Sequence, residues 1–159
     1  MLVELIPPAV ASMAAVCDIL WRRIPNWLTL SAFAGGLLLQ VLRIGAPGLL
    51  VALGGAALGL GLLLPFYAIH VVGAGDVKLL GAVGALVGPQ DLVSVAIYAA
   101  LVGGAVSCVM LLRRGRLALS IADILSRPTN LTRSGAKAPY GVAIAGGVYL
   151  SMLLPSVIG

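Results

Sequence analysis

The chain has 159 residues, of which 61% are apolar and only 9% charged, and its mean hydropathy is +1.15. Soluble domains are about one quarter charged, and a domain this small leaves much of its surface in water, so this composition excludes a soluble globular fold. It also excludes disorder, which needs low hydrophobicity and high charge. The net charge of +5 is typical of the basic cytoplasmic loops of a membrane protein, so we expect no nucleic-acid partner.

Charges, prolines and glycines divide the chain into six apolar segments. Most of them approach the ~20 residues that a helix needs to cross the hydrocarbon core of a bilayer. We therefore expect an all-α polytopic membrane protein in which residues 1–159 form one membrane-embedded domain. Arg22 and Arg23 follow the first segment, the reverse of the charge order in a signal peptide, so we expect this segment to be retained. The segments are residues 4–21, 27–43, 48–70, 77–88, 92–112 and 138–157.

The fourth segment is too short to cross the membrane by itself. Residues 77–88 would form a helix of roughly 18 Å, at 1.5 Å per residue. Either this span starts deep in the membrane, or residues 73–76 before it are irregular backbone at membrane depth. Such backbone is tolerated only where it is buried in protein or lines a wet cavity.

The basic residues predict the orientation of the spans. Six spans place nine of the ten on one side and only Arg43 on the other. The positive-inside rule then makes the basic side cytoplasmic and puts both termini on the opposite side. Most of these residues belong to the long loop 113–137, in which apolar residues at helical spacing predict an interfacial helix on anionic lipid.

Only five acidic residues are present, so each can be weighed separately. We interpret Glu4 as solvated, Asp123 as solvated or paired with an arginine of the basic loop, and Asp91 as the N-cap of a helix. Asp18 and Asp76 differ, because each lies at the predicted cytoplasmic end of an apolar span. An ionisable residue inside a span is costly and is a functional-site hypothesis by default. The alternative is that each aspartate simply pairs with a neighbouring Arg or Lys.

If Asp18 and Asp76 meet, they provide the chemistry of an aspartic protease. Two close carboxylates share a proton, so the ionised one acts as a general base on water while the protonated one donates to a carbonyl oxygen. This reaction needs no metal and no cofactor. Gly73 and Gly75 permit a positive φ and a close backbone approach beside Asp76. The single histidine, His70, has no partner motif, and we interpret it as interfacial.

Three motifs together resemble the GxGD aspartyl membrane peptidases, in particular the bacterial type IV prepilin peptidases. Residues 73–79, GAGDVKL, are similar to the GxGDxK motif of that family. Asp18 is followed by Arg23 and by Ile-Pro-Asn with Pro25 and Asn26, as in the first-aspartate motif. Residues 137–141, KAPYG, are similar to the element that opens the last helices.

This resemblance implies that Asp18 and Asp76 are a catalytic dyad. It also implies substrate-binding or site-shaping roles for Gly73, Gly75, Lys78, Arg23, Pro25 and Asn26. The implied substrate is a type IV prepilin, with a leader peptide and an apolar helix, cut at the cytoplasmic face of the inner membrane.

One departure from the larger prepilin peptidases concerns methylation. Those enzymes carry a cytoplasmic domain with paired cysteines, associated with N-methylation, between their first two helices. Here residues 22–26 form a five-residue connection, and Cys17 and Cys108 form no CxxC pair. We expect both cysteines to be small buried residues. The size suits the minimal peptidases of tight-adherence (Flp-type) pilus systems, and an archaeal preflagellin peptidase is a related alternative.

Two other classes of protein remain as alternatives. A proton- or cation-coupled transporter would use both aspartates as a relay, but it predicts a polar stripe that the second, third and fifth spans lack. A non-catalytic scaffold of pilus assembly would need neither aspartate. The sequence does not identify the prepilin, the oligomeric state or any pilus-assembly partner.

Overall fold

The structure, a computed structural model, describes residues 5–21, 24–69, 72–113 and 140–154, and their regular secondary structure is helical. Three of the helices, α2, α3 and α5, are long and apolar enough to cross a membrane. The all-α membrane fold is therefore confirmed, while the interfacial helix predicted for 113–137 lies almost wholly outside the described residues. The helices are α1 (Ile6–Trp21), α2 (Asn26–Ile44), α3 (Pro47–Ala68), α4 (Ala74–Val87), α5 (Pro89–Arg113) and α7 (Tyr140–Leu153).

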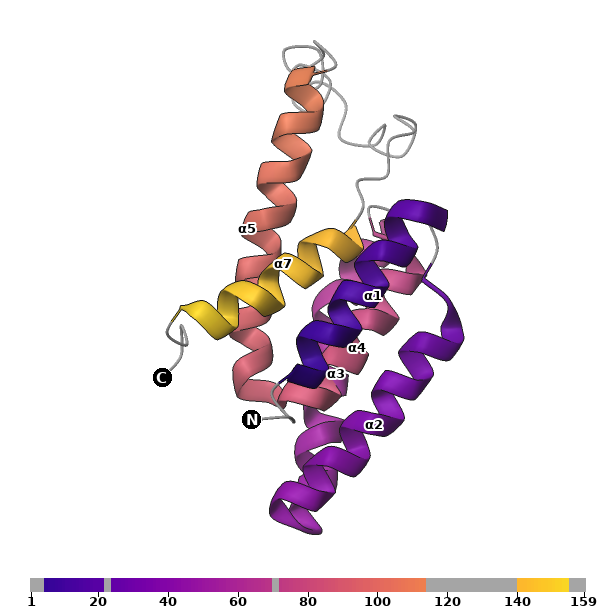
Figure 1. Cartoon of the computed structure of the whole chain (residues 1–159), viewed down its shortest axis with the longest axis vertical. Coiled ribbons are helices and arrows are strands. Elements are labelled where there is room, and N and C mark those ends of the chain that lie inside the picture. Colours follow the sequence, from indigo (N-terminus) through magenta and orange to yellow (C-terminus); the bar gives the residue numbers. More distant parts are fainter. Residues whose placement is uncertain (1–4, 22–23, 70–71, 114–139, 155–159) are drawn as a thin grey trace.

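The short fourth span is confirmed, and it is the central helix of the bundle. α4 has 14 residues, and its buried residues include an unbroken run from Leu79 to Leu86. It packs against α1, α2, α3, α5 and α7 (Figure 1). The largest core cluster joins Leu79, Leu80 and Val83 to apolar side chains of α1, α2, α5 and α7. α4 is therefore enclosed by protein, which explains how a helix too short to span the membrane alone is accommodated.

Glycines bring α3 and α4 into backbone contact. A Cβ added at Gly55 would collide with the carbonyl oxygen of Gly84, and a Cβ at Gly84 would collide with that of Gly55. One turn further along α3, a Cβ at Gly59 would lie 2.5 Å from the carbonyl oxygen of Leu80. Such contacts replace the hydrophobic driving force that helices lack in lipid.

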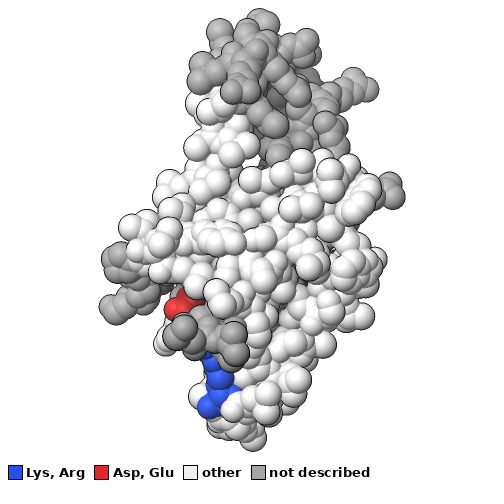
Figure 2. All heavy atoms as spheres, viewed as in Figure 1, with Lys and Arg blue, Asp and Glu red and all other residues white. Residues whose placement is uncertain are grey.

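The face of the bundle in Figure 2 is apolar. Its described atoms are nearly all uncharged, and the acidic and basic groups visible on it lie low in the view. Large side chains such as Leu42 and Leu50 are 77% and 74% exposed, which suits contact with lipid. Cys17 is buried, as expected, but Cys108 is exposed on α5. The expectation of two buried cysteines is therefore wrong for Cys108, because the later turns of α5 have few neighbours in the bundle.

Successive helices run in opposite directions, so the end of one helix and the start of the next lie at the same end of the bundle. α1 rises in Figure 1 while α2 and α4 descend from the same upper end. α7 begins beside the upper part of α1 and runs obliquely downward. The last turn of α1 and the first turns of α2, α4 and α7 define what we call the upper end.

Candidate active site

Asp18 lies in the last turn of α1 and is held by the start of α7. Its carboxylate oxygen Oδ2 accepts a hydrogen bond of 2.9 Å from the backbone N–H of Gly141. Gly141 is the second residue of α7, where backbone N–H groups have no partner within the helix. The carboxylate thus sits at the positive end of a helix dipole. A Cβ at Gly141 would lie 2.9 Å from both the Cβ and Oδ2 of Asp18, so only glycine fits without a shift.

Asp76 lies in the first turn of α4 rather than in a loop. Its Oδ2 accepts a hydrogen bond of 3.2 Å from the backbone N–H of Gly73, the residue that caps the helix. Gly73 has φ −78° and ψ 151°, an ordinary extended conformation. It therefore does not adopt the positive φ that glycine permits. The described glycines that do adopt a positive φ are Gly45 and Gly88, at the C-terminal ends of α2 and α4.

Two further contacts tie the start of α4 to the connection between α1 and α2. A Cβ at Gly75 would lie 3.3 Å from the Cβ of Ile24, a closer approach than most side chains tolerate. Lys78 donates a hydrogen bond of 3.1 Å from Nζ to the side-chain oxygen Oδ1 of Asn26. The last turn of α1, which carries Asp18, and the first turn of α4, which carries Asp76, therefore lie at the same end of the bundle.

The Ile-Pro-Asn sequence forms the start of α2. Pro25 is the N-cap residue, with φ −67° and ψ 138°, and its carbonyl oxygen accepts a hydrogen bond of 3.1 Å from the N–H of Leu28. The ring of proline favours this extended geometry, so the helix begins immediately after it, at Asn26. Arg23 and His70 lie outside the described residues, as do Lys137 to Pro139.

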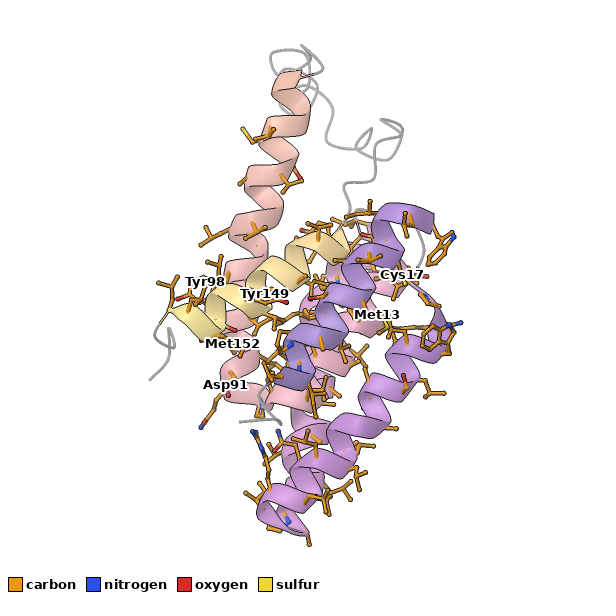
Figure 3. All side chains as sticks on the ribbon, in the orientation of Figure 1. Met13, Cys17, Asp91, Tyr98, Tyr149 and Met152 are labelled. Atoms are coloured by element: carbon orange, nitrogen blue, oxygen red, sulfur yellow. The ribbon has the colours of Figure 1, made fainter. Side chains whose placement is uncertain are left out.

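The third acidic residue that the structure describes lies at the opposite end of the bundle. α5 begins at Pro89, so Asp91 lies within its first turn and the N-cap interpretation is wrong. Proline is favoured as the first residue of a helix, which explains the earlier start. Figure 3 shows Asp91 at the lower end of α5, far from Cys17, the neighbour of Asp18.

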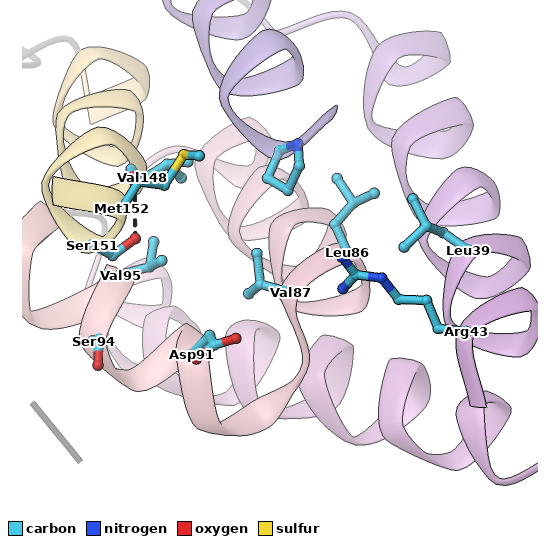
Figure 4. Close-up of a pocket in the computed structure, with 11 residues that line it drawn as sticks. Leu39, Arg43, Leu86, Val87, Asp91, Ser94, Val95, Val148, Ser151 and Met152 are labelled. Carbon is cyan, nitrogen blue, oxygen red and sulfur yellow. Dashed lines mark hydrogen bonds between the residues drawn. The ribbon is translucent and has the colours of Figure 1, made fainter. Parts of the chain in front are cut away.

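Asp91 and Arg43 line a pocket of about 210 Å³ at that lower end. Figure 4 shows Arg43 reaching from α2 toward Leu86, with Val87 between Arg43 and Asp91 in this view. Neither candidate aspartate lines this pocket. Among the described residues, no three His, Cys, Asp or Glu side chains gather as metal ligands.

The contact between Gly141 and Asp18 could not be derived from the sequence. The KAPYG motif drew attention to residues 137–141. The two partners are 123 positions apart in the sequence, however, and no sequence pattern indicates which helix end contacts the carboxylate. The sequence signal for this contact was Gly141 itself, a glycine at the start of an apolar helix.

Comparison with known protein families matches residues 5–108 to the type IV leader peptidase family. The match contains both aspartates and the Ile-Pro-Asn and GxGD motifs, whereas α7 lies beyond it. No curated protein and no solved structure matches the chain. Because the match covers well over half of the sequence, the chain belongs to the type IV leader peptidase family.

Proposed function

We propose that this protein is an aspartic endopeptidase that removes the leader of a type IV prepilin at the cytoplasmic face of the inner membrane. Membership of the leader peptidase family supports proteolysis of a leader. The observation that carries the aspartic mechanism is the position of Asp18 and Asp76. Each lies at the upper end of the bundle, and each accepts a hydrogen bond from a backbone N–H at the start of a helix.

The proposed mechanism uses the two carboxyl groups in opposite protonation states. The ionised one removes a proton from water as the water oxygen attacks the scissile carbonyl carbon, and the protonated one donates its proton to the carbonyl oxygen. The tetrahedral intermediate then collapses. Its C–N bond breaks as the leaving amine takes the proton that the first carboxylate gained. The second carboxylate recovers its proton from the hydroxyl group that becomes the new C=O. The mechanism requires no nucleophilic side chain and no cofactor.

The remaining motif residues would shape this site. Gly73, the N-cap of α4, lies close to Asp76, and Gly75, in its first turn, lies close to Ile24. The hydrogen bond from Lys78 to Asn26 fixes the start of α4 against the start of α2. Pro25 sets where α2 begins. We assign Arg23 to substrate binding, because it adjoins this turn in the sequence.

Co-expression with a candidate prepilin tests the proposal through removal of the leader. Asp18→Asn and Asp76→Asn should each lower the cleavage rate by about 10²–10⁴, because an amide cannot act as a general base. The paired carboxylates act as a unit, so the double variant should be scarcely slower than either single variant. All variants should still accumulate in the membrane, since a neutral amide is easier to hold there than a carboxylate.

The matched control is Asp91→Asn, at the lower end of the bundle, which should retain most of the activity. Near wild-type cleavage by Asp18→Asn or Asp76→Asn would exclude that residue from catalysis, whereas the absence of any cleavage by the wild type would favour a scaffold. Purified enzyme should remain active in a chelator. Loss of activity restored by zinc would instead identify a metalloprotease.

A further inference from the structure

The pocket lined by Arg43 and Asp91, which we call the lower pocket, lies between two groups of helices. α2 packs mainly on α3 and α4, whereas α7 packs mainly on α1 and α5. The pocket takes residues from α2, α4, α5 and α7, and from the start of α1. A molecule bound there therefore contacts α2 as well as α5 and α7, which pack little against α2 themselves.

The lower pocket carries two opposite charges that do not pair with each other. Arg43 lies in the last turn of α2, and Asp91 lies in the first turn of α5. Figure 4 shows them on opposite sides of the pocket. Neither side chain forms an ion pair or a hydrogen bond with the residues that the structure describes. Unpaired opposite charges on facing walls suit a ligand that itself carries both charges.

Arg43 is also the exception in the distribution of basic residues. The six-span topology predicted from the sequence places it on the external side, away from the other nine. The positive-inside rule therefore gives no reason for a cation at this position. A guanidinium group binds phosphate through two parallel N–H groups, and lipid phosphates lie just outside the hydrocarbon core, where the end of a span places Arg43. A lipid phosphate is thus the anion that Arg43 is best placed to bind.

The side of the pocket opposite Arg43 suits an ammonium group. Ser151 lines this side together with Asp91. The hydroxyl group of Ser151 donates a hydrogen bond of 2.8 Å to the carbonyl oxygen of Val148. Its oxygen is therefore left to accept a hydrogen bond, and a carboxylate is also an acceptor. A primary ammonium group offers three N–H donors and a positive charge, whereas a trimethylated ammonium group offers no donor and a glycerol group offers no charge.

The size of the pocket suits a lipid headgroup rather than a whole lipid. Its volume is about 210 Å³, below the roughly 300–1,000 Å³ of pockets that enclose drug-sized ligands. Leu39, Leu86 and Met152 form apolar walls, against which the carbon atoms of a headgroup can pack. The acyl chains of such a lipid would remain outside the pocket, in the bilayer.

We propose that the lower pocket binds the headgroup of a zwitterionic phospholipid with a primary ammonium group, the chemistry of phosphatidylethanolamine. Arg43 binds the phosphate, and Asp91 and Ser151 accept hydrogen bonds from the ammonium group. The bound lipid links α2 to α5 and α7 and stabilises the bundle from its external side. Because Asp18 and Asp76 lie at the upper end, the lipid affects stability rather than catalysis, and Asp91→Asn remains a control for cleavage. This inference does not depend on the proposed function.

Thermal unfolding of the full-length chain in detergent tests the proposal with lipids that differ only in the headgroup. Phosphatidylethanolamine at 100 times its Kd should raise the unfolding temperature by roughly 5–10 °C. Phosphatidylcholine and phosphatidylglycerol should raise it less, because the first has no N–H donor and the second has no cation. Equal shifts with all three lipids, or the largest shift with phosphatidylglycerol, would overturn the proposal. Free phosphoethanolamine should act only at far higher concentration, and equal potency would identify a soluble ligand instead of a lipid.

Variants of the two charged residues locate the site. Arg43→Gln and Asp91→Asn should each lose most of the shift that phosphatidylethanolamine causes, measured from the lipid-free unfolding temperature of the same variant. The matched control is Gln90→Ala, an exposed polar residue outside the pocket, which should keep the wild-type shift. A full shift in both charge variants would overturn the proposal. So would a fall in the lipid-free unfolding temperature of Arg43→Gln as large as the wild-type shift, because Arg43 would then already have a partner within the chain.

Discussion

Gly141 is the residue through which α7 contributes to the candidate site. Its N–H holds the carboxylate of Asp18, and the space beside it is filled by that side chain. Gly141→Ala should therefore push Asp18 away and weaken the hydrogen bond, which lowers kcat in a prepilin cleavage assay without loss of folded protein. A tenfold decrease would correspond to about 1.4 kcal/mol of lost stabilisation in the transition state.

Gly104→Ala is the matched control for this prediction. Gly104 lies in α5, and a Cβ there would meet no atom within 4 Å. The Gly104→Ala variant should cleave prepilin at the wild-type rate. If Gly141→Ala did the same, the contact with α7 would have no part in positioning Asp18.

Much of the candidate site could be predicted at the scale of single residues, because ionisable groups in apolar spans are rare. Asp18, Asp76 and Lys78 were identified from the sequence, and so was the glycine-rich approach to α4. The partners that hold them were not identified, since the N–H of Gly141 comes from a distant helix.

At the scale of helices, the contact between α3 and α4 depends on glycine. Gly55→Ala should destabilise the protein by about 1–3 kcal/mol, because the added methyl group meets the backbone of Gly84 and neither helix can yield by a side-chain movement. Thermal unfolding in detergent measures the effect. Gly61→Ala, in the same helix, meets nothing within 4 Å and should unfold at or slightly above the wild-type temperature. Equal stability of the two variants would contradict a tight α3–α4 interface.

The ends of the helices show how accurately sequence patterns predict helix boundaries. The apolar segments located the described helices to within a few residues, because charges and prolines mark where spans end. The pattern failed for α5, in which Pro89 begins the helix and Asp91 lies in its first turn. It failed also before α4, in which Gly75 and Asp76 are already helical. Both differences arise because small or cyclic residues begin a helix as readily as they interrupt one.

For the whole molecule, the six-span topology predicts which loops share a side of the membrane. Reporter fusions after Gly45 and at Gly159 should both report the external side, and a fusion after Arg116 should report the cytoplasm. The basis is the nine-to-one distribution of basic residues, together with the antiparallel order of the helices in Figure 1. Reporters after Arg116 and at Gly159 on the same side would contradict this topology.

The shortness of α4 makes the protein sensitive to the thickness of its membrane. Its 14 residues span about 21 Å, which is less than the ~30 Å of hydrocarbon in a typical bilayer. With the lower end of α4 level with the membrane surface, Asp76, two residues inside the helix, would lie about 12 Å beneath the opposite surface unless the bilayer thins there. Water is a reactant, so lipids with longer acyl chains should slow the cleavage of prepilin, and short-chain lipids should accelerate it. The same hydrophobic mismatch would favour thin regions of membrane as the place where leaders are removed.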